Sequence, residues 1–294
     1  MERRSHSHRV VFSALAASLA VAFLAALYIH AHFARYQPRA VYHLPSRVEA
    51  VAWLNVEQNV GFDVFKEVVL PILEIGRHGP ESRVLHLERK TTLELAVDTR
   101  EFVFATLPRG RWLALAGGHF RQDGVLSGLV RMVKESGSDA RLDQDLAVLT
   151  TGHALGISHD GVLVVSNSEE VAREAILEQD EGMEWKALLH KPGTMFNFLA
   201  YGPSTRFDGV PVFSGVARRF WLSVEPGNPF PVFVEGVGED SAVSVVPPPQ
   251  LTHGAWHKRA GPSGISMISG TVVSEDLRSF LRAWGREIQT QVWK

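Results

Sequence analysis

The longest apolar stretch of the chain lies close to its start. From Val10 to Ile29 the sequence holds twenty residues without a charged side chain. A helix of that length spans roughly 30 Å, which is the thickness of the hydrocarbon core of a bilayer. Three arginines precede the stretch, and Tyr28 lies at its far end, where interfacial aromatic residues are common. The pattern predicts a transmembrane helix.

We interpret this segment as an uncleaved signal anchor. A cut after Ala31 would place Ile29 at a position where signal peptidase requires a small residue. Three Lys or Arg residues precede the segment and three more lie in the twenty residues after it, so the charge rule is nearly balanced. The free amino terminus favours a cytoplasmic tail and an exported domain. The reverse orientation, with the domain in the cytoplasm, stays open.

Beyond the anchor, short apolar runs bounded by Gly, Pro, Asn or Asp predict strands. Turn residues at 108–110, 159–161 and 226–229 predict that several of these strands pair as hairpins. The predicted strands are Ala50–Val56, Glu101–Leu107, Trp112–Ala116, Leu146–Thr150, Gly161–Ser166, Met195–Tyr201, Phe220–Val224, Pro231–Val237 and Ile265–Val273.

Apolar residues at helical spacing predict four helices between and after these strands. They are Gln122–Lys134, Ser168–Glu178, Ser274–Ile288 and Asp63–Ile75, the last kinked or split by Pro71. Single helices between hairpins indicate the α+β class, with antiparallel sheets and helices packed on one face. The organisation we expect is a cytoplasmic tail and anchor (1–29), a linker (30–43), a first α+β half (44–182), a join (183–193) and a second half with a C-terminal amphipathic helix (194–294). Whether the halves share a topology stays open.

Composition narrows the class of protein. Hydrophobic residues make up 45% of the chain and charged residues 21%, which excludes a disordered chain. A formal net charge of −2 provides no basic field for nucleic acid. The chain has no cysteine, so disulfides, thiolate nucleophiles and thiolate metal sites are excluded. Neither cysteine nor an Asn-x-Ser/Thr glycosylation site is present, which favours a bacterial inner-membrane protein with a periplasmic domain.

No motif in the chain predicts catalysis or a metal. His253 and His257 have the spacing of a helical ligand pair, but prolines and glycines surround them and a helix is not expected there. Ser158, His159 and Asp160 are adjacent, whereas catalytic triads are assembled from distant positions, so a turn explains them. We therefore assign no catalytic residue, no cofactor and no metal ligand.

Residues 246–264 form the candidate contact region. This proline-rich stretch of nineteen residues carries Trp256, His257, Lys258 and Arg259 in succession, and its composition predicts a long loop. Long loops within compact domains are commonly functional. An aromatic and basic tip could contact a protein partner, a glycan or a lipid headgroup. The alternative is a tolerated insertion with a buried tryptophan.

The order of elements in the first half resembles a known group of proteins. His43-Leu44-Pro45 precedes the hydrophobic strand Ala50–Val56, and a hairpin at Arg109-Gly110, a helix and a second hairpin lead to Val164–Val171. This order resembles that of uncharacterised bacterial envelope proteins with an N-terminal anchor and an α+β extracytoplasmic domain. In those proteins an "LP-x-x-x-x-A" opening precedes a hydrophobic strand. The resemblance covers about residues 44–180 and implies fold and location only.

The sequence thus predicts a membrane-tethered, non-catalytic domain in the periplasm that binds or scaffolds another envelope component. The alternative is a periplasmic enzyme of the hydrolase type whose site is dispersed along the chain. A concave pocket where three or more polar side chains converge would favour the enzyme. A flat apolar patch near Trp256 or Trp293 would favour a partner surface.

Overall fold

The computed structural model describes most of the chain after residue 37. The described residues are 38–59, 61–64, 66–67, 98–118, 120, 124–135, 137, 139–177, 189, 193–201, 217–238, 245, 247–260 and 265–292. The predicted anchor from Val10 to Ile29 lies outside them. Within the described part, no helix is both long and apolar enough to cross a membrane. The predicted helix Asp63–Ile75 is helical at residues 63, 64, 66 and 67, and its remainder lies outside the described residues.

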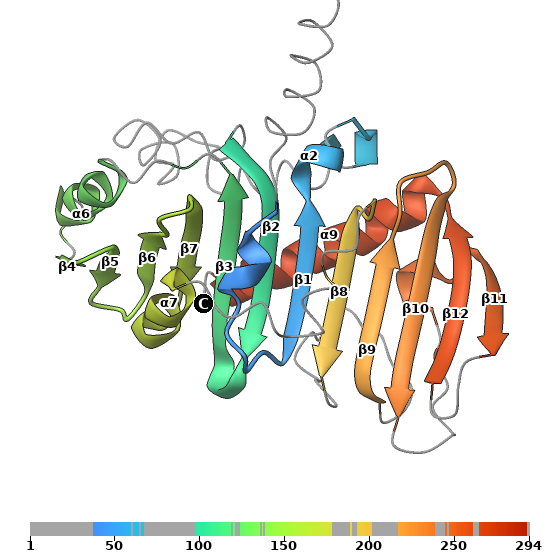
Figure 1. The fold of residues 1–294 in the computed structure, drawn as a ribbon. Coiled ribbons are helices and arrows are strands. Elements are labelled where there is room, and N and C mark those ends of the chain that lie inside the picture. Colours follow the sequence, from blue (N-terminus) through green and yellow to red (C-terminus); the bar gives the residue numbers. More distant parts are fainter. Residues whose placement is uncertain are drawn as a thin grey trace, which may run out of the picture. The chain divides into compact units, whose positions relative to one another are not determined.

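The described strands form one sheet of twelve strands, and each neighbouring pair is antiparallel (Figure 1). The order across the sheet is β11-β12-β10-β9-β8-β1-β2-β3-β7-β6-β5-β4. The strands are β1 (Ala50–Asn55), β2 (Thr99–Leu107), β3 (Arg111–Gly118), β4 (Ala140–Asp143), β5 (Leu146–Leu149), β6 (Ala154–Ile157), β7 (Val162–Ser166), β8 (Phe196–Tyr201), β9 (Ala217–Val224), β10 (Phe230–Gly238), β11 (Ala255–Ala260) and β12 (Ile265–Val272).

The nine predicted strands are confirmed, with small shifts at their ends. The structure adds β4, β6 and β11, which the sequence did not predict. β4 and β11 are rich in charged residues, so neither shows a clear apolar run, and β6 is a short apolar strand interrupted by a glycine.

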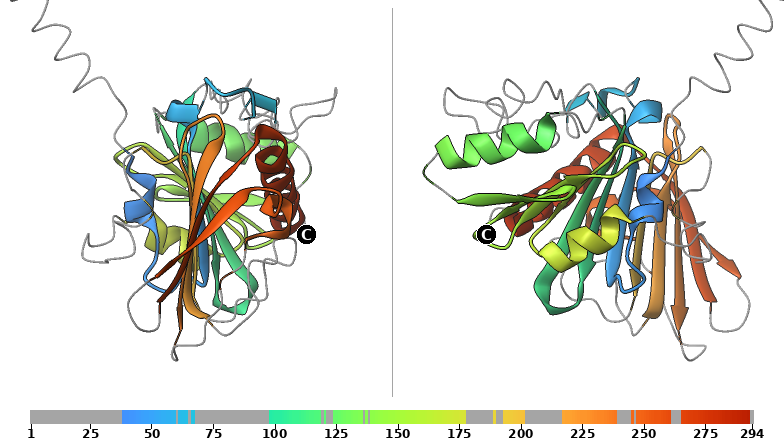
Figure 2. Two further views of the ribbon diagram at one scale, coloured as in Figure 1. Left: turned by 90° about the vertical axis from the view of Figure 1, so that its right-hand side faces the viewer. Right: turned by 60° about the vertical axis from the view of Figure 1, so that its left-hand side comes forward.

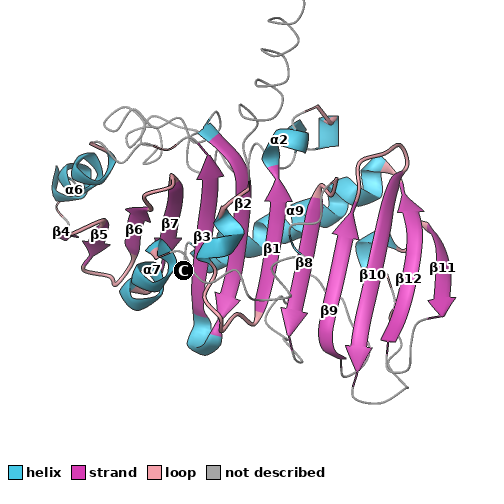
Figure 3. Ribbon diagram, in the orientation of Figure 1, coloured by secondary structure: helices cyan, strands magenta, loops and turns pink. Residues whose placement is uncertain are grey.

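The predicted helices agree in position with helices of the structure where they are described, and the structure adds the short segments η1, α2, η2 and η3 (Figure 3). Three of the four predicted helices correspond to α6, α7 and α9. The helical segments are η1 (Ala40–His43), α2 (Val56–Asn59), η2 (Pro108–Gly110), α6 (Val125–Glu135), α7 (Glu169–Ile176), η3 (Pro249–Leu251) and α9 (Ser274–Val292). The coarse α+β class is therefore confirmed.

Helices cover both faces of the sheet, so the expectation that they cover one face is wrong. Ala50, Ala52 and Leu54 of β1 pack into the apolar cluster of α9. The alternate residues Val51 and Trp53 pack into a second cluster with η1 and α7. The views in Figure 2 show these helices on opposite sides of the strands. Because every residue of β1 is buried, its apolar run is continuous, and such a strand needs cover on both faces.

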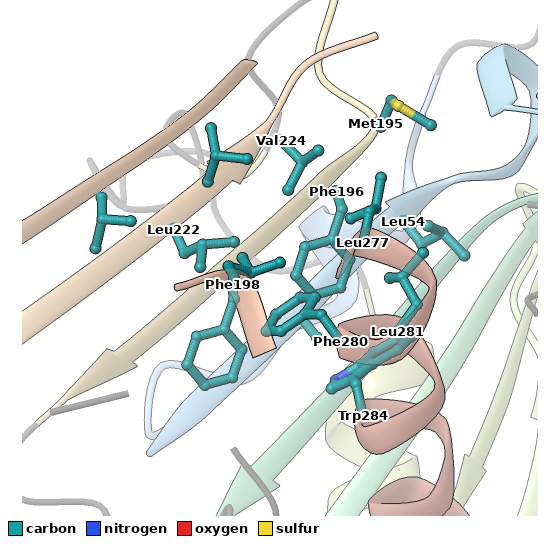
Figure 4. Packing of buried hydrophobic residues seen from close by; sticks show 14 of the residues in the cluster. Leu54, Met195, Phe196, Phe198, Leu222, Val224, Leu277, Phe280, Leu281 and Trp284 are labelled. Carbon is teal, nitrogen blue, oxygen red and sulfur yellow. The ribbon is translucent and has the colours of Figure 1, made fainter. Parts of the chain in front are cut away.

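The apolar stripe of α9 forms the centre of the first cluster. Leu277, Phe280, Leu281 and Trp284 are buried against the sheet (Figure 4). The ring of Phe196 meets the ring of Phe280 at a centroid distance of 5.7 Å and that of Trp284 at 5.1 Å, both edge-on. Burying each such side chain contributes about 1.5–3 kcal/mol. The predicted amphipathic C-terminal helix is thus confirmed as part of the core.

The other helices cover the β1–β7 side of the sheet. Val171, Ala172 and Ala175 of α7 pack with η1 on the face opposite α9. α6 packs through its own apolar stripe onto β4, β5 and β6. Leu163 of β7 contacts the cluster at the start of α6, while its neighbours on both sides belong to the cluster of α7. The alternation places α6 on the same face of the sheet as α9.

Burial follows a different pattern at the β11 side of the sheet. Along β10, Phe230, Val232 and Val234 are buried, whereas Phe233 and Glu235 between them are partly exposed. The buried residues face the α9 cluster. None of the described helices covers the opposite face of β9, β10 and β12 (Figure 1). This open face holds a cleft.

Candidate ligand-binding cleft

A cleft of about 560 Å³ lies on the open face of β9, β10, β12 and β11. The strand period of two brings its side chains to one face, because residues at alternate positions of neighbouring strands share a side. Its apolar lining includes Trp221, Pro231 and Phe233, and its polar lining consists of Glu225, His257, Ser269 and Thr271. The volume is in the range of small-molecule and side-chain pockets.

The apolar floor of the cleft is firmly supported. The rings of Trp221 and Phe233 lie 5.2 Å apart and are tilted by 57°. Trp221 is buried, and its Nε1 donates a hydrogen bond of 3.3 Å to Oδ1 of Asn197. Asn197 is itself fully buried and donates to Leu189 O at 2.7 Å and Thr194 Oγ1 at 2.8 Å. This chain of hydrogen bonds fixes the indole, so the floor is preorganised for a ligand.

An ion pair lies on the same face, beside the floor. Arg219 Nη2 is 3.0 Å from Glu235 Oε1. Glu235 pairs across the strands with Trp221, so the ion pair adjoins the indole. The face therefore changes from aromatic to charged over a short distance, as in surfaces that bind amphipathic ligands.

The polar lining does not form a catalytic pair. Ser269 and Thr271 are the hydroxyl groups of the cleft, and His257 is its imidazole. Among the described residues, no hydrogen bond joins either hydroxyl to His257. Activation of a serine or threonine requires a base within hydrogen-bond reach.

The predicted partner-contact loop is an edge strand. Trp256, His257, Lys258 and Arg259 lie in β11, which pairs with β12 and ends the sheet of described strands. The expectation of a long structureless loop is therefore wrong. The charged residues hid the strand, because its apolar content is too low for the periodicity to show. Whether these residues contact a partner stays a prediction.

Trp256, His257 and Lys258 lie in different surroundings. Trp256 packs against the α9 cluster, and its Nε1 donates a hydrogen bond of 2.8 Å to Leu251 O. A Cβ on Gly270 would come within 2.9 Å of the indole, so glycine is required beneath it. His257 points to the other face and lines the cleft. Lys258 is exposed. Trp256 is thus partly buried against the core, and His257 is the predicted contact residue that lines the cleft.

A second polar cluster joins η1 to the opposite end of the sheet. The ring of His43 is fully buried, with Nδ1 2.7 Å from Ala175 O and Nε2 3.1 Å from both carboxylate oxygens of Asp160. Each ring nitrogen therefore lies within hydrogen-bond distance of an oxygen atom. Ser158 Oγ donates a further hydrogen bond to Asp160. The cluster ties η1 to the β6–β7 turn and to α7.

The electrostatics of Asp160 favour its charged form. Burial opposes the ionisation of this carboxyl group, but hydrogen bonds from Ser158 and His43 outweigh the burial. Together they hold the pKa of Asp160 below its usual value of 3.8. The aspartate lies between the serine and the histidine, whereas a catalytic triad places the histidine in the middle. Because His43 is fully buried, we interpret this cluster as a structural contact that joins η1 to α7 and to the β6–β7 turn.

The sequence brought Ser158 and Asp160 to attention but paired them with the wrong histidine. His159 is their neighbour in the chain, whereas the structure supplies His43 from a segment 117 residues before Asp160. A buried carboxylate binds the opposite end of the same segment. Glu101 accepts hydrogen bonds from the backbone amides of Arg39 and Ala40 through Oε1, and from Trp53 Nε1 at 2.9 Å through Oε2. Neither contact was visible from sequence spacing.

In the described part of the chain, no group of three or more His, Asp or Glu side chains could hold a metal ion. His253 and His257, the pair with ligand spacing, occupy a turn and a strand. His253 lies 3.7 Å from Asp276 and is largely exposed. The cleft residues that sequence analysis missed are Trp221, Glu225, Phe233, Ser269 and Thr271. The sequence signal that could have found them is the alternation of residue types along 230–237. Such alternation is typical of a strand whose two faces are not equally buried.

Comparisons with known proteins define the fold and no more. No protein-family model matches the chain, and no curated protein is detectably similar to it. The crystal structure of TP0453 in crystal form I matches with a TM-score of 0.51 at 11% sequence identity. The match covers 86% of this chain and 98% of that one. At this identity the likeness concerns the fold alone.

Proposed function

We propose that this protein is a membrane-tethered domain of the bacterial envelope that binds a partner in its cleft and does not catalyse a reaction. The observation that carries the proposal is the cleft itself, an aromatic floor with a polar rim on a sheet face that none of the described helices covers. Binding sites combine such apolar surface with a few polar groups that fix orientation. The anchor from Val10 to Ile29 would tether the domain to the membrane, with the domain in the periplasm.

The topology of the two halves supports a dedicated binding face. In the first half, β1, β2 and β3 form a meander, β7 returns beside β3, and α7 follows. In the second half, β8, β9 and β10 form a meander, β12 returns beside β10, and α9 follows. We infer that the halves share one topology. α7 and α9 would then be counterparts, yet they pack on opposite faces of the sheet. The face that α7 covers in the first half is therefore the face that carries the cleft in the second.

A site-specific crosslink tests the proposal. A photoreactive amino acid at Thr271, on the rim of the cleft, is expected to capture one discrete partner when the full chain is irradiated in its own membrane. Leu177 is a matched control, because it is exposed at the end of α7, away from the cleft. Ser269→Phe, which fills the cleft, should abolish the crosslink from Thr271. A crosslink that survives this substitution, or that forms equally from Leu177, would refute binding in the cleft.

The location needs its own test. An export-dependent alkaline phosphatase fused after Lys294 is expected to be active, and a fluorescent protein that folds only in the cytoplasm is expected to stay dark. The opposite result would place the domain in the cytoplasm and remove the envelope partner from the proposal.

One observation favours the enzyme alternative. Four polar side chains, from Glu225, His257, Ser269 and Thr271, converge on the cleft. Hydrolysis of simple aryl esters by the purified full chain in detergent tests it. Turnover that Ser269→Ala or His257→Ala removes would assign a hydrolase. The absence of a hydrogen bond between Ser269 and His257 leads us to expect no turnover above that of the unfolded chain.

A further inference from the structure

The edge strand β11 borders the cleft directly. Ala255 and His257, at alternate positions of β11, belong to the cleft lining. Beyond β11 the sheet of described strands ends (Figure 3). An exposed edge presents backbone donors and acceptors that a further strand can bind. A strand added there would carry every second side chain along the mouth of the cleft, because the side chains of neighbouring strands share faces.

The charge of the edge indicates what that strand would carry on its other face. Lys258 is exposed, and it forms no ion pair with the described residues. Its cross-strand neighbour on β12 is the buried Ile268 of the α9 cluster, so Lys258 lies on the face away from the cleft. Acidic side chains directly opposite such positions are favourable cross-strand partners.

A second copy of this chain is a poorer occupant of the edge. Antiparallel pairing of β11 with its own copy, centred on Lys258, would place the two Lys258 side chains opposite each other, where like charges repel. The charge of Lys258 attracts an acidic strand and would also protect the edge against self-association.

We propose that β11 binds an extended acidic segment of a partner protein by strand addition, with apolar side chains over the cleft and acidic side chains opposite Lys258. The inference rests on the proposed function, and it names the chemistry of the ligand. In this mode of recognition, main-chain hydrogen bonds supply affinity and the pocket beside the strand supplies specificity. The ligand alternates acidic and apolar residues over at least the six positions of β11.

A pair of synthetic peptides tests the charge preference. A fluorescent nonapeptide that alternates Glu with Val is titrated against the full chain in detergent, and its affinity is compared with that of the same peptide carrying Lys in place of Glu. We expect the Glu peptide to bind at least about tenfold tighter. Lys258→Glu should weaken its binding about five- to tenfold. Arg131→Glu is the matched control, because Arg131 is exposed on α6, far from the edge. Equal binding of both peptides would overturn the inference.

Amide hydrogen exchange tests strand addition itself. Binding of the Glu peptide is expected to slow exchange over residues 255–260, because outward amides become hydrogen-bonded. Protection confined to other strands would overturn the inference. Protection of the same residues that rises with protein concentration in the absence of peptide, together with a dimeric mass, would assign the edge to a second copy instead. If the Thr271 crosslink forms but these peptide results fail, this inference alone is wrong; loss of the crosslink refutes the proposed function as well.

Discussion

The middle of the sheet and its β11 end share the same antiparallel strand pairing but differ in how their faces are covered. At the β1 side, all six residues of the central strand are buried because helical segments cover both faces. At the β11 side, β10 buries alternate residues only, and its other face carries Phe233, Glu235 and the cleft. The difference lies in the helical cover, since the strands are antiparallel throughout. We therefore expect substitutions in the covered middle of the sheet to change stability and substitutions at the open β11 end to change binding.

The largest expected effect is at the helix that covers the central strands. Trp284→Ala should lower the free energy of unfolding by about 3–5 kcal/mol, because it leaves a cavity where the indole packs against Phe196. Urea denaturation of the full chain in detergent, followed by circular dichroism, measures the change. Arg282→Ala on the exposed side of α9 is the control and should cost less than about 0.5 kcal/mol. Similar effects of the two substitutions would mean that α9 is not the cover that the structure shows.

A somewhat smaller effect is expected at the His43–Asp160 contact, which helps to join η1 to α7. Asp160→Ala removes the partner of the buried His43 and should destabilise the chain by about 3 kcal/mol. The same denaturation assay measures it, and Asp145→Ala in the neighbouring β4–β5 turn is a control at an exposed carboxylate. A cost below about 0.5 kcal/mol would contradict a stabilising contact between these two side chains.

The pH dependence of stability sharpens this prediction. The pKa of Asp160 is lower in the folded chain than its usual value of 3.8. The stabilisation from this group is therefore fully present above pH 3.8 and is lost as the pH falls through the lower folded pKa. Asp160→Ala should remove that part of the acid dependence. An unchanged acid profile would show that another carboxyl group causes it.

The carboxylate on the other side of η1 is expected to contribute less. Glu101→Gln keeps the size of the side chain but places an amide NH₂ where one carboxylate oxygen accepts a hydrogen bond, so either Trp53 Nε1 or the backbone amides of residues 39 and 40 lose their acceptor. The cost should be about 1–3 kcal/mol. Glu57→Gln, at an exposed site on α2, is the control. Faster amide exchange at residues 39 and 40 would show that their hydrogen bonds to residue 101 are weakened. Unchanged exchange would argue against a role of Glu101 in holding this segment.

The smallest effect on stability is expected at the open end. Ser269→Phe should change the free energy of unfolding by less than about 1 kcal/mol, because residue 269 is partly exposed and faces the cleft. Binding of the Glu peptide should nevertheless weaken at least about tenfold, since the new ring occupies the cleft. Loss of stability with intact binding would reverse the comparison between the two regions.

Hydrophobic periodicity was sufficient for most elements of the described fold. Nine strands and three helices were predicted within a few residues, because Val-, Leu- and aromatic-rich runs between turn residues are unambiguous over short distances. The β4 and β11 strands failed the same test because their charged residues lie at sheet edges, where no second face must be buried. These two edge strands have little apolar content, and they are recognised only by their hydrogen-bonded pairing with β5 and β12.

The candidate site was much harder to predict than the fold. His257 was singled out for its basic and aromatic neighbours, and it does line the cleft; Trp256 was singled out with it and packs into the core instead. The opposite outcomes follow from the strand period, which a loop interpretation cannot use. Trp221, Phe233 and Ser269 come from three other strands, and their convergence depends on a register that no local pattern encodes.

The sequence by itself determined the positions of most strands and helices, the α+β class and the amphipathic stripe of α9, because those features depend on periodicities of a few residues. Only the tertiary structure decided that the strands form one sheet, that α7 and α9 cover opposite faces, and that His43 meets Asp160 rather than His159. These are contacts between segments far apart in the chain. Their energy depends on which surfaces are left to be buried once the local elements have formed, and the cleft lies on the face that no described helix covers.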